Sequence, residues 1–479
     1  MSKERPSHWV PGRSASDKAR LAVFNVLMDV EADGAYANIV LPRQLRSWHF
    51  GRRDSAYATN LAYGTLRLQG RWDAILEHCM GGRRIEDTDL PVRVLLRMGT
   101  HQLLEFGTAP HAAVNETVTL TRNEIGTGAS KFVNAVLHRV SERSVKEWQE
   151  IIRADAGGKA NSVAFLSRWF SHPGWIIRAL SQALNASGRP HKDILKVLKA
   201  DNTPAHVALV ARAITLGDLE ADIERGSMTS APGKLVDSAL LLTSGAPHRV
   251  FAVKDGLAGV QDEGSQLIAR TLANAPLEGR DQLWLDMCAG PGGKTATLAS
   301  YAAKRGARIH ANEIHEHRVN LVADSVRYWS NIVDLRLGDG TEIGAQEPQA
   351  YDRILIDAPC TGIGALRRRP EARWRKEAGD ALDLAVLQGK LLDSGYAALR
   401  EGGVMCYSTC SPYLTETRSV VESFLERTDA QLIDAGPIAS AQAKMTIDSA
   451  DKMVQLWPDL HHSDAMFFAL ITKPSKESA

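Results

Sequence analysis

Hydrophobic residues in the first third of the chain recur at the spacing of amphipathic helices. Residues 21–27, 94–98 and 132–137 each carry apolar side chains three or four positions apart, and glycines at 81–82 and 126–128 interrupt the pattern. The alternation typical of strands is hard to find in this region. We therefore predict an all-α domain over residues 16–147, preceded by a disordered tail at residues 1–15.

The pattern becomes mixed in the middle of the chain. Helical spacing continues to about residue 201, and an apolar run at 206–210 then precedes a helix-like segment at 216–225. This order predicts a connector over residues 148–258, helical at first and then a small α+β unit.

Short apolar runs alternate with turns and helical segments from residue 261 onward. The runs that predict strands lie at 283–287, 308–312, 333–337, 351–357 and 403–407. Strands that alternate with helices favour a doubly wound, mostly parallel sheet. We therefore predict a multidomain protein whose C-terminal domain, residues 259–474, is an α/β Rossmann-like domain.

Composition narrows the function classes only slightly. The formal net charge of +1 gives no general argument for nucleic-acid binding, so such an argument must be local. The polar N-terminus lacks the apolar core of a signal peptide, and no stretch approaches the length of a transmembrane helix. Four of the five cysteines lie between 288 and 410 without the pairing of a zinc site. We expect a cytoplasmic monomer with reduced thiols, no metal and no membrane association.

Candidate cofactor-binding residues follow the first three predicted strands of the C-terminal domain. In doubly wound sheets, ligands bind at the carboxyl ends of strands. Glu313, which ends the second strand, is suited to ribose hydroxyls, and Asp339 after the third could receive an adenine amino group. Together these strand ends favour S-adenosylmethionine over a tight turn without a ligand. The glycine-rich turn after the first strand comprises Cys288, Ala289, Gly290, Pro291, Gly292, Gly293 and Lys294.

That turn does not fit two other nucleotide-binding motifs. A triphosphate-binding P-loop needs glycine where Cys288 stands, and a dinucleotide fingerprint needs glycine at Thr295. Neither a nucleoside triphosphate nor a dinucleotide is therefore the expected ligand.

Two further strand ends each carry a cysteine. Cys360 follows the fourth predicted strand and Cys410 the fifth, whereas Cys406 lies within its strand and Cys79 in the helical region. A thiolate that adds to carbon 6 of cytosine makes carbon 5 nucleophilic toward a methyl group, and it leaves easily afterwards. A single cysteine is more often a small buried hydrophobe, which is our interpretation of Cys79 and Cys406. The spacing leaves open which of the other two attacks.

A basic segment lies between these cysteines. Residues 366–376 contain six basic residues, one acidic residue and a tryptophan, which suits phosphate contacts and base stacking, although such a run can also be only a solvated face. The target base must be single-stranded or flipped out to reach the pocket. The predicted RNA contacts are Arg367, Arg368, Arg369, Arg373 and Lys376.

Taken together, these residues resemble the RsmB (Sun/Fmu) family of ribosomal RNA 5-methylcytidine methyltransferases. Residues 261–266 (QDEGSQ) are similar to the signature before its first strand. Residues 54–68, 110–116 and 132–139 resemble its NusB-like RNA-binding domain. The resemblance implies 16S ribosomal RNA, or an early small-subunit particle, as the substrate. It also implies an α/β class I methyltransferase domain that uses S-adenosylmethionine.

The resemblance also implies roles for individual residues. Cys410 corresponds to the nucleophile, and Cys360 to the cysteine that helps to release the product. Residues 414–418 (LTETR) depart from the Pro-Glu-Glu-Asn stretch that is usual after the nucleophile, and residues 464–468 (DAMFF) depart from an Asp-Gly-Phe-Phe pattern. The implied cofactor contacts, besides the turn at 288–294, are Glu313, Arg318, Asp339 and Asp357.

Two classes of alternative remain at this point. One is a transfer-RNA or DNA cytosine methyltransferase, which only a comparison of substrates separates from the ribosomal enzyme. The other is a non-catalytic RNA-binding protein, such as an assembly or antitermination factor built on the helical domain. Two cysteines at adjacent strand ends favour the enzyme, because a binding module does not need them.

Overall fold

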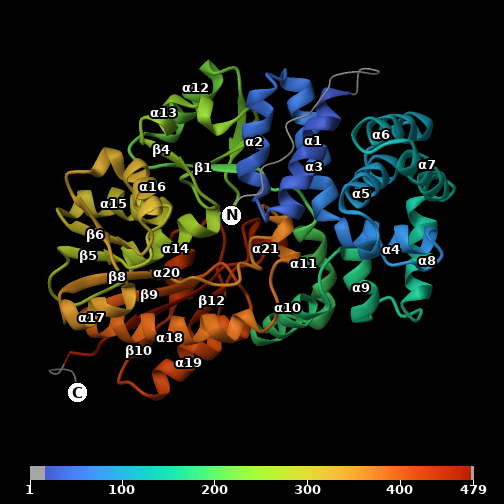
Figure 1. Ribbon diagram of the computed structural model, residues 1–479. Coiled ribbons are helices and arrows are strands. Elements are labelled where there is room, and N and C mark those ends of the chain that lie inside the picture. The colour runs from blue at the N-terminus through green and yellow to red at the C-terminus, as the bar shows by residue number, and fades with distance from the viewer. Residues whose placement is uncertain (1–16, 476–479) are drawn as a thin grey trace. The chain divides into compact units, whose positions relative to one another are not determined.

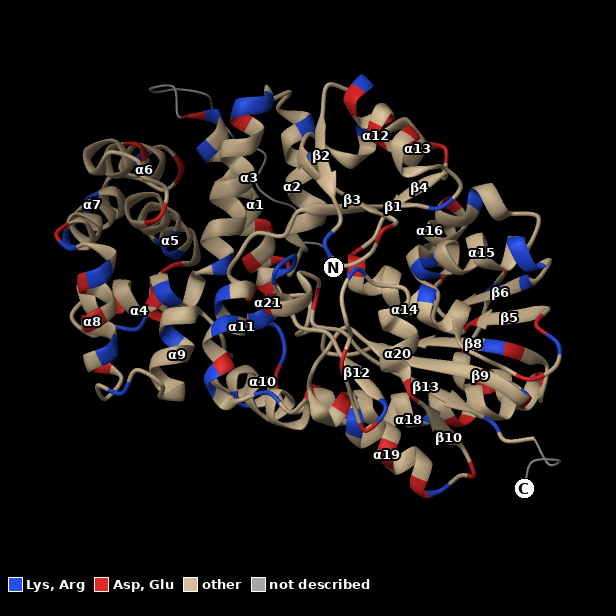
Figure 2. Ribbon diagram, turned by 180° about the vertical axis from the view of Figure 1, so that it is seen from behind, with Lys and Arg blue, Asp and Glu red and all other residues tan. Residues whose placement is uncertain are grey.

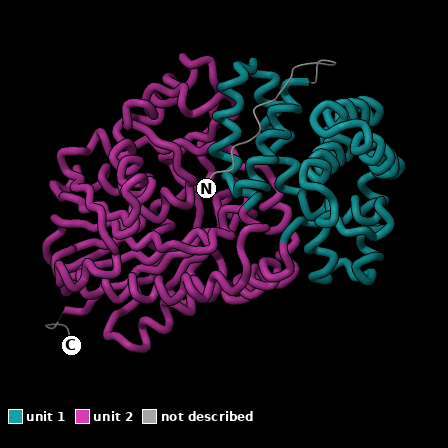
Figure 3. The backbone as a smooth tube through the Cα atoms, viewed as in Figure 1, with its two compact units in different colours: residues 1–172, 369–371 teal, residues 173–368, 372–479 magenta. Residues whose placement is uncertain are grey.

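The computed structural model describes residues 17–475, which divide into two compact units (Figure 3). Within the described residues, the first unit comprises residues 17–172 and Arg369–Glu371, and the second comprises Pro173–Arg368 and residues 372–475. The tail predicted at residues 1–15 lies outside the described residues, and the domain limits at 147 and 258 stay predictions. Among residues 17–475, no helix combines the length and the apolar character that a membrane crossing requires.

The first unit is helical, as the sequence predicts (Figure 1). Its first helix begins where the Asp17 carboxylate accepts a hydrogen bond from the Ala19 amide, and its eighth begins with a capping box formed by Ser144 and Glu147. Apolar faces of the first, third and fifth helices form its main core. The helices are α1 (Lys18–Ala32), α2 (Ala37–Ser47), α3 (Arg52–Arg67), α4 (Gln69–Cys79), α5 (Leu90–Leu104), α6 (Pro110–Glu124), α7 (Thr127–Ser141), α8 (Val145–Asp155) and α9 (Val163–Phe170).

The second unit begins with two helices and a small antiparallel sheet. The sheet has the strand order β2-β3-β1-β4, which confirms the small α+β element predicted after residue 201. Its apolar face packs against the helix that follows β1. The elements are α10 (Gly174–Ala186), α11 (Ile194–Asp201), β1 (Val207–Ala211), α12 (Leu216–Arg225), β2 (Thr229–Pro232), β3 (Ala239–Ser244), α13 (Phe251–Lys254) and β4 (Ala258–Val260).

A larger mixed sheet forms the rest of the second unit, with the order β11-β12-β13-β9-β8-β5-β6-β7 and β10 paired to β13. The strands from β9 to β7 are parallel, and their positions confirm the five predicted strands. The antiparallel strands beyond β9 were not predicted from the sequence. The strands are β5 (Leu283–Asp286), β6 (Arg308–Glu313), β7 (Val333–Leu337), β8 (Tyr351–Asp357), β9 (Leu399–Thr409), β10 (Gln431–Ile433), β11 (Ser449–Ala450), β12 (Met453–Gln455) and β13 (Phe467–Thr472).

Helices cover both faces of this sheet (Figure 1). One apolar core joins the sheet to α14, α15, α16 and α20, and a second core on the other face joins it to α17, α18 and α19. β8 is buried along nearly its whole length because both of its faces are covered, which explains the apolar run Ile354–Ile356. The buried Asp352 and Arg353 near its start form ion pairs. The helices are α14 (Glu263–Asn274), α15 (Gly293–Arg305), α16 (Glu316–Val326), α17 (Ile343–Gln346), α18 (Asp380–Ala398), α19 (Arg418–Glu426), α20 (Ala435–Ser440) and α21 (Pro458–His461).

Charged residues follow no simple division between the units. Basic and acidic positions are interspersed along the helices of each unit (Figure 2), in keeping with the net charge of +1. Any preference for an anionic ligand must therefore come from local groups of side chains.

Candidate active site

The glycine-rich turn after β5 is fitted closely to the end of β6. The Gly290 amide donates a hydrogen bond to Glu313 Oε2 at 3.1 Å, and Arg318 Nη2 donates to the Gly290 carbonyl at 3.1 Å. A Cβ atom at position 290 would lie 2.2 Å from Glu313 Oε2. Gly292 adopts a φ of 97° where α15 begins, a conformation that favours glycine. The turn thus needs glycine at both positions, for contact and for backbone conformation.

The carboxyl ends of β6 and β7 present two acidic residues. Glu313 is only 4% exposed, and its Oε1 accepts a hydrogen bond from the His315 amide. Asp339 is exposed at the start of the turn after β7, where its Oδ1 accepts from the Thr341 amide. Asn312 joins the loops by donating to the carbonyls of Met287 and Gly338. The strand ends predicted to bind a nucleoside are therefore adjacent and tied together.

Charged groups link the turn to the end of β8. Lys294 Nζ lies 2.7 Å from Asp357 Oδ2, and Ser408 at the end of β9 donates to the other oxygen of Asp357. Asp286 is fully buried and accepts a hydrogen bond from Thr295, and burial raises its pKa to about 7. Its Oδ1 atom has no hydrogen-bond partner among the described residues. The site therefore contains a lysine, an aspartate paired to it and a buried polar atom without a partner.

The two strand-end cysteines lie side by side. Cys360 Sγ and Cys410 Sγ are 3.4 Å apart, which is within hydrogen-bond range for sulfur. A hydrogen bond from Cys360 lowers the pKa of Cys410, and the positive charge of Lys294 acts in the same direction. The same hydrogen bond raises the pKa of Cys360 well above its ordinary value. The pair thus favours a thiolate on Cys410 and a thiol on Cys360.

The other three cysteines lack these features. Burial raises the pKa of Cys79 to about 11, and it raises the pKa of Cys288 and of Cys406 beyond the ordinary range. A thiolate is the reactive form, so these three thiols are poor nucleophiles. Among the cysteines, only Cys410 combines a strand-end position with a lowered pKa.

A buried glutamate, which the sequence analysis did not single out, holds the two cysteine loops together. Glu416 is fully buried in the short 3-10 turn Leu414–Glu416. Its Oε1 accepts from the Thr361 amide at 2.6 Å, and its Oε2 accepts from the Thr361 hydroxyl at 2.5 Å and the Ser411 hydroxyl at 2.7 Å. Thr361 follows Cys360 and Ser411 follows Cys410. The only sequence feature that pointed to Glu416 is its place in the stretch 414–418, which departs from the Pro-Glu-Glu-Asn pattern that is usual after the nucleophile.

The basic segment is divided among several environments. The Arg373 side chain is fully buried and donates to Asn202 Oδ1 and to the Asp201 carbonyl, so in this structure it is not accessible to a phosphate. Arg368 forms an ion pair with the buried Asp464, although 43% of its side chain is exposed. Of the other predicted RNA contacts, Arg367 donates to the His462 carbonyl, the exposed Arg369 lies over the Tyr36 ring, and Lys376 is partly exposed.

Comparisons with known proteins give one consistent result. A family model described as 16S rRNA methyltransferase RsmB/F matches residues 273–472, and a NusB family model matches residues 17–142. A Mycobacterium tuberculosis protein (strain ATCC 25618 / H37Rv) that is named as a methyltransferase is 40% identical over 97% of this chain and 98% of its own length. The Vibrio cholerae ribosomal RNA small subunit methyltransferase B is 29% identical over 88% of this chain and 90% of its own length.

A solved structure supports the fold along nearly the whole chain. The crystal structure of PH0851 superposes with a TM-score of 0.76 at 19% sequence identity, and the match covers 96% of this chain and 100% of that one. At this level of identity, the likeness extends to the fold alone.

Proposed function

Since the chain belongs to the RsmB/F family of 16S rRNA methyltransferases, we propose that it methylates carbon 5 of a cytidine in small-subunit ribosomal RNA. S-adenosylmethionine is the proposed methyl donor. The observation that carries the proposal is the 3.4 Å separation of the Cys360 and Cys410 sulfur atoms at adjacent strand ends. One sulfur atom favoured as a thiolate and one favoured as a thiol match the needs of covalent addition and elimination.

In the proposed reaction, Cys410 is the nucleophile. Its thiolate adds to carbon 6 of the cytosine, which makes carbon 5 electron-rich enough to take the methyl group. Carbon 5 then loses its proton to solvent, the carbon–sulfur bond breaks, and the electron pair returns to Cys410. The thiol of Cys360, at 3.4 Å, donates a hydrogen bond to the departing thiolate and so promotes product release.

The residues of the turn after β5 fit S-adenosylmethionine. The Glu313 carboxylate, held by two backbone amides, is suited to bind ribose hydroxyls, and Asp339 at the next strand end is suited to the adenine amino group. Arg318 supports Glu313 from 3.6 Å. Lys294 of the turn forms an ion pair with Asp357, and the charges of both act on Cys410. When bound, this cofactor supplies an activated methyl group.

We expect Gly290→Ala to weaken S-adenosylmethionine binding by about tenfold or more. The new Cβ would require Glu313 Oε2 to move away from a 2.2 Å contact, which breaks the bond from the residue 290 amide. Isothermal titration calorimetry measures the change. The control is Gly389→Ala in α18, where an added Cβ meets no atom within 4 Å. Equal affinities for the two variants would contradict the proposed position of the cofactor.

We expect the reactivity of Cys410 to depend on Cys360. Because the hydrogen bond from Cys360 lowers the pKa of Cys410, Cys360→Ala should raise that pKa and move the alkylation of Cys410 to higher pH. Cys360→Ser retains a donor, so its profile should lie between those of the wild type and the alanine variant. Iodoacetamide labelling followed by peptide mass spectrometry gives each profile. An unchanged midpoint in Cys360→Ala would refute the coupling.

The decisive test of the function is methyl transfer from tritiated S-adenosylmethionine to unmodified small-subunit ribosomal RNA, followed by digestion to nucleosides. Label in 5-methylcytidine from ribosomal RNA is the expected result. Label only in transfer RNA would favour the transfer-RNA alternative. No label in either RNA, together with no rise of the melting temperature by S-adenosylmethionine, would favour the non-catalytic RNA-binding protein.

A further inference from the structure

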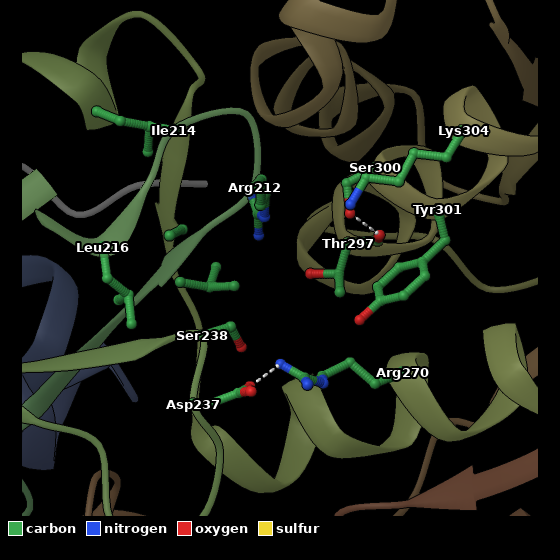
Figure 4. A pocket seen from close by; sticks show the side chains of 12 residues that line it. Arg212, Ile214, Leu216, Asp237, Ser238, Arg270, Thr297, Ser300, Tyr301 and Lys304 are labelled. Carbon is green, nitrogen blue, oxygen red and sulfur yellow. Dashed lines mark hydrogen bonds and ion pairs between the residues drawn. The ribbon is translucent and has the colours of Figure 1, made fainter. Parts of the chain in front are cut away.

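A cavity of about 350 Å³ lies between the small sheet and the helix that follows the cofactor turn, apart from the cysteine pair. Figure 4 shows Arg212 entering it from the residue after β1, and Arg270 from α14. Tyr301 and Lys304 come from one face of α15 on the opposite side. Among the described residues that line the cavity, three side chains are basic and one, Asp237, is acidic. The cavity therefore favours an anion.

Arg212 carries a positive charge that the described residues do not neutralise. Its Nη2 donates to neutral acceptors only, Gln261 Oε1 at 3.2 Å and the Gly293 carbonyl at 3.0 Å. Its Nε is buried without a hydrogen-bond partner, and burial lowers the pKa of its guanidinium to about 10. Placing a cation in such surroundings costs free energy, and a bound anion would recover part of it.

The other two basic side chains of the cavity, Arg270 and Lys304, differ in whether they form ion pairs. Arg270 is partly neutralised, because its Nη1 lies 2.7 Å from Asp237 Oδ1. Lys304 forms no ion pair within residues 17–475, and its Nζ lies 5.8 Å from the centre of the Tyr301 ring. Arg212 and Lys304, on opposite walls, are therefore the two charges that are available to a ligand.

We propose that this cavity binds the phosphate group of a nucleotide, either within the RNA strand or as a free nucleotide. A phosphate presents several acceptor oxygens, which suits donors that converge from different walls: the Arg212 guanidinium, the Tyr301 hydroxyl and the Lys304 ammonium. The volume exceeds the roughly 30 Å³ of a water molecule about tenfold, so the cavity has room for the attached sugar as well. In its RNA form, the proposal rests on the proposed function.

The experiment measures the affinity of short single-stranded RNA by fluorescence anisotropy over a series of salt concentrations. The test variants are Lys304→Gln, which changes an exposed side chain, and Arg212→Gln. The control is Lys254→Gln in α13, an exposed lysine outside the cavity. If the RNA strand is the source, each test variant should reduce the slope of log K against log salt by about 0.7 and weaken binding several-fold, while the control retains the wild-type slope.

The second arm measures melting temperatures with adenosine monophosphate and with inorganic phosphate. If a free nucleotide is the source, adenosine monophosphate should stabilise the wild type and the control but not Arg212→Gln. The proposal would be overturned if the salt slopes did not change and adenosine monophosphate stabilised the wild type, the two test variants and the control equally. The methyl-transfer assay separates the failure of the proposed function from the failure of the cavity assignment. If the salt slope changes but no 5-methylcytidine forms, only the proposed function fails. If 5-methylcytidine forms but no variant changes binding, only the cavity assignment fails.

Discussion

Cys410→Ala should abolish methyl transfer to ribosomal RNA, with a loss on the order of 10⁴-fold or more. Without the sulfur atom no adduct forms at carbon 6, and carbon 5 remains too electron-poor to accept the methyl group. Cys410→Ser should be nearly as inactive, because a hydroxyl is far less acidic than a thiol. Methyl-transfer assays measure the loss, and calorimetric binding of S-adenosylmethionine verifies that the variants are folded.

The matched variants replace Cys406, within β9, and Cys360, just after the end of β8. Cys406→Ala, in the buried part of β9, should retain activity because burial keeps this thiol protonated. Cys360→Ala should instead leave protein attached to RNA, visible as a slowly migrating band on a denaturing gel, because elimination loses its hydrogen-bond donor. An inactive Cys360→Ala protein without adduct, beside an active Cys410→Ala protein, would reverse the proposed roles.

The second large effect is expected at Glu416. Glu416→Ala removes the acceptor for the Thr361 amide, the Thr361 hydroxyl and the Ser411 hydroxyl, all of them buried. Unsatisfied buried donors should lower the free energy of unfolding by about 2–4 kcal/mol. Because these bonds hold the loops that carry Cys360 and Cys410, a displacement of about 1 Å should lower kcat roughly 100-fold.

The readouts for Glu416 separate positioning from folding. Glu416→Gln retains one carbonyl acceptor, and its amide can donate to hydroxyls that reorient, so it should recover much of the stability and part of the activity. Glu422→Ala, an exposed residue of α19, is the control. If Glu416 positions the two cysteines, the pH profile of Cys410 alkylation should also move to higher pH in Glu416→Ala. A loss of stability with an unchanged profile and unchanged kcat would leave Glu416 a purely structural residue.

Local sequence patterns were sufficient for the five parallel strands of the large sheet. The apolar run Ile354–Ile356 predicts β8 because a strand covered on both faces is mostly apolar at its centre. The glycines at 290, 292 and 293 mark the turn because few other residues accept its conformation and its close contacts. The antiparallel strands beyond β9 were missed. β10, β11 and β12 are two or three residues long, too short for a period-two pattern to appear. β13 is six residues long but is buried along nearly its whole length, so its apolar run shows no alternation.

The sequence by itself determined the fold class, the turn after β5 and the presence of a cysteine at each of two strand ends, because hydrophobic period and turn chemistry act within a few residues. Only the tertiary structure decided how those residues meet. The contact between Cys360 and Cys410 joins positions 50 residues apart, and Glu416 reaches Thr361 across 55 residues. Burial also depends on distant partners. Arg373 is one of the RNA contacts that the sequence predicts, but it is enclosed against Asp201 and Asn202, 172 and 171 positions earlier. Hydrogen bonds and desolvation depend on what surrounds a side chain in space, and neighbours in sequence do not supply that information.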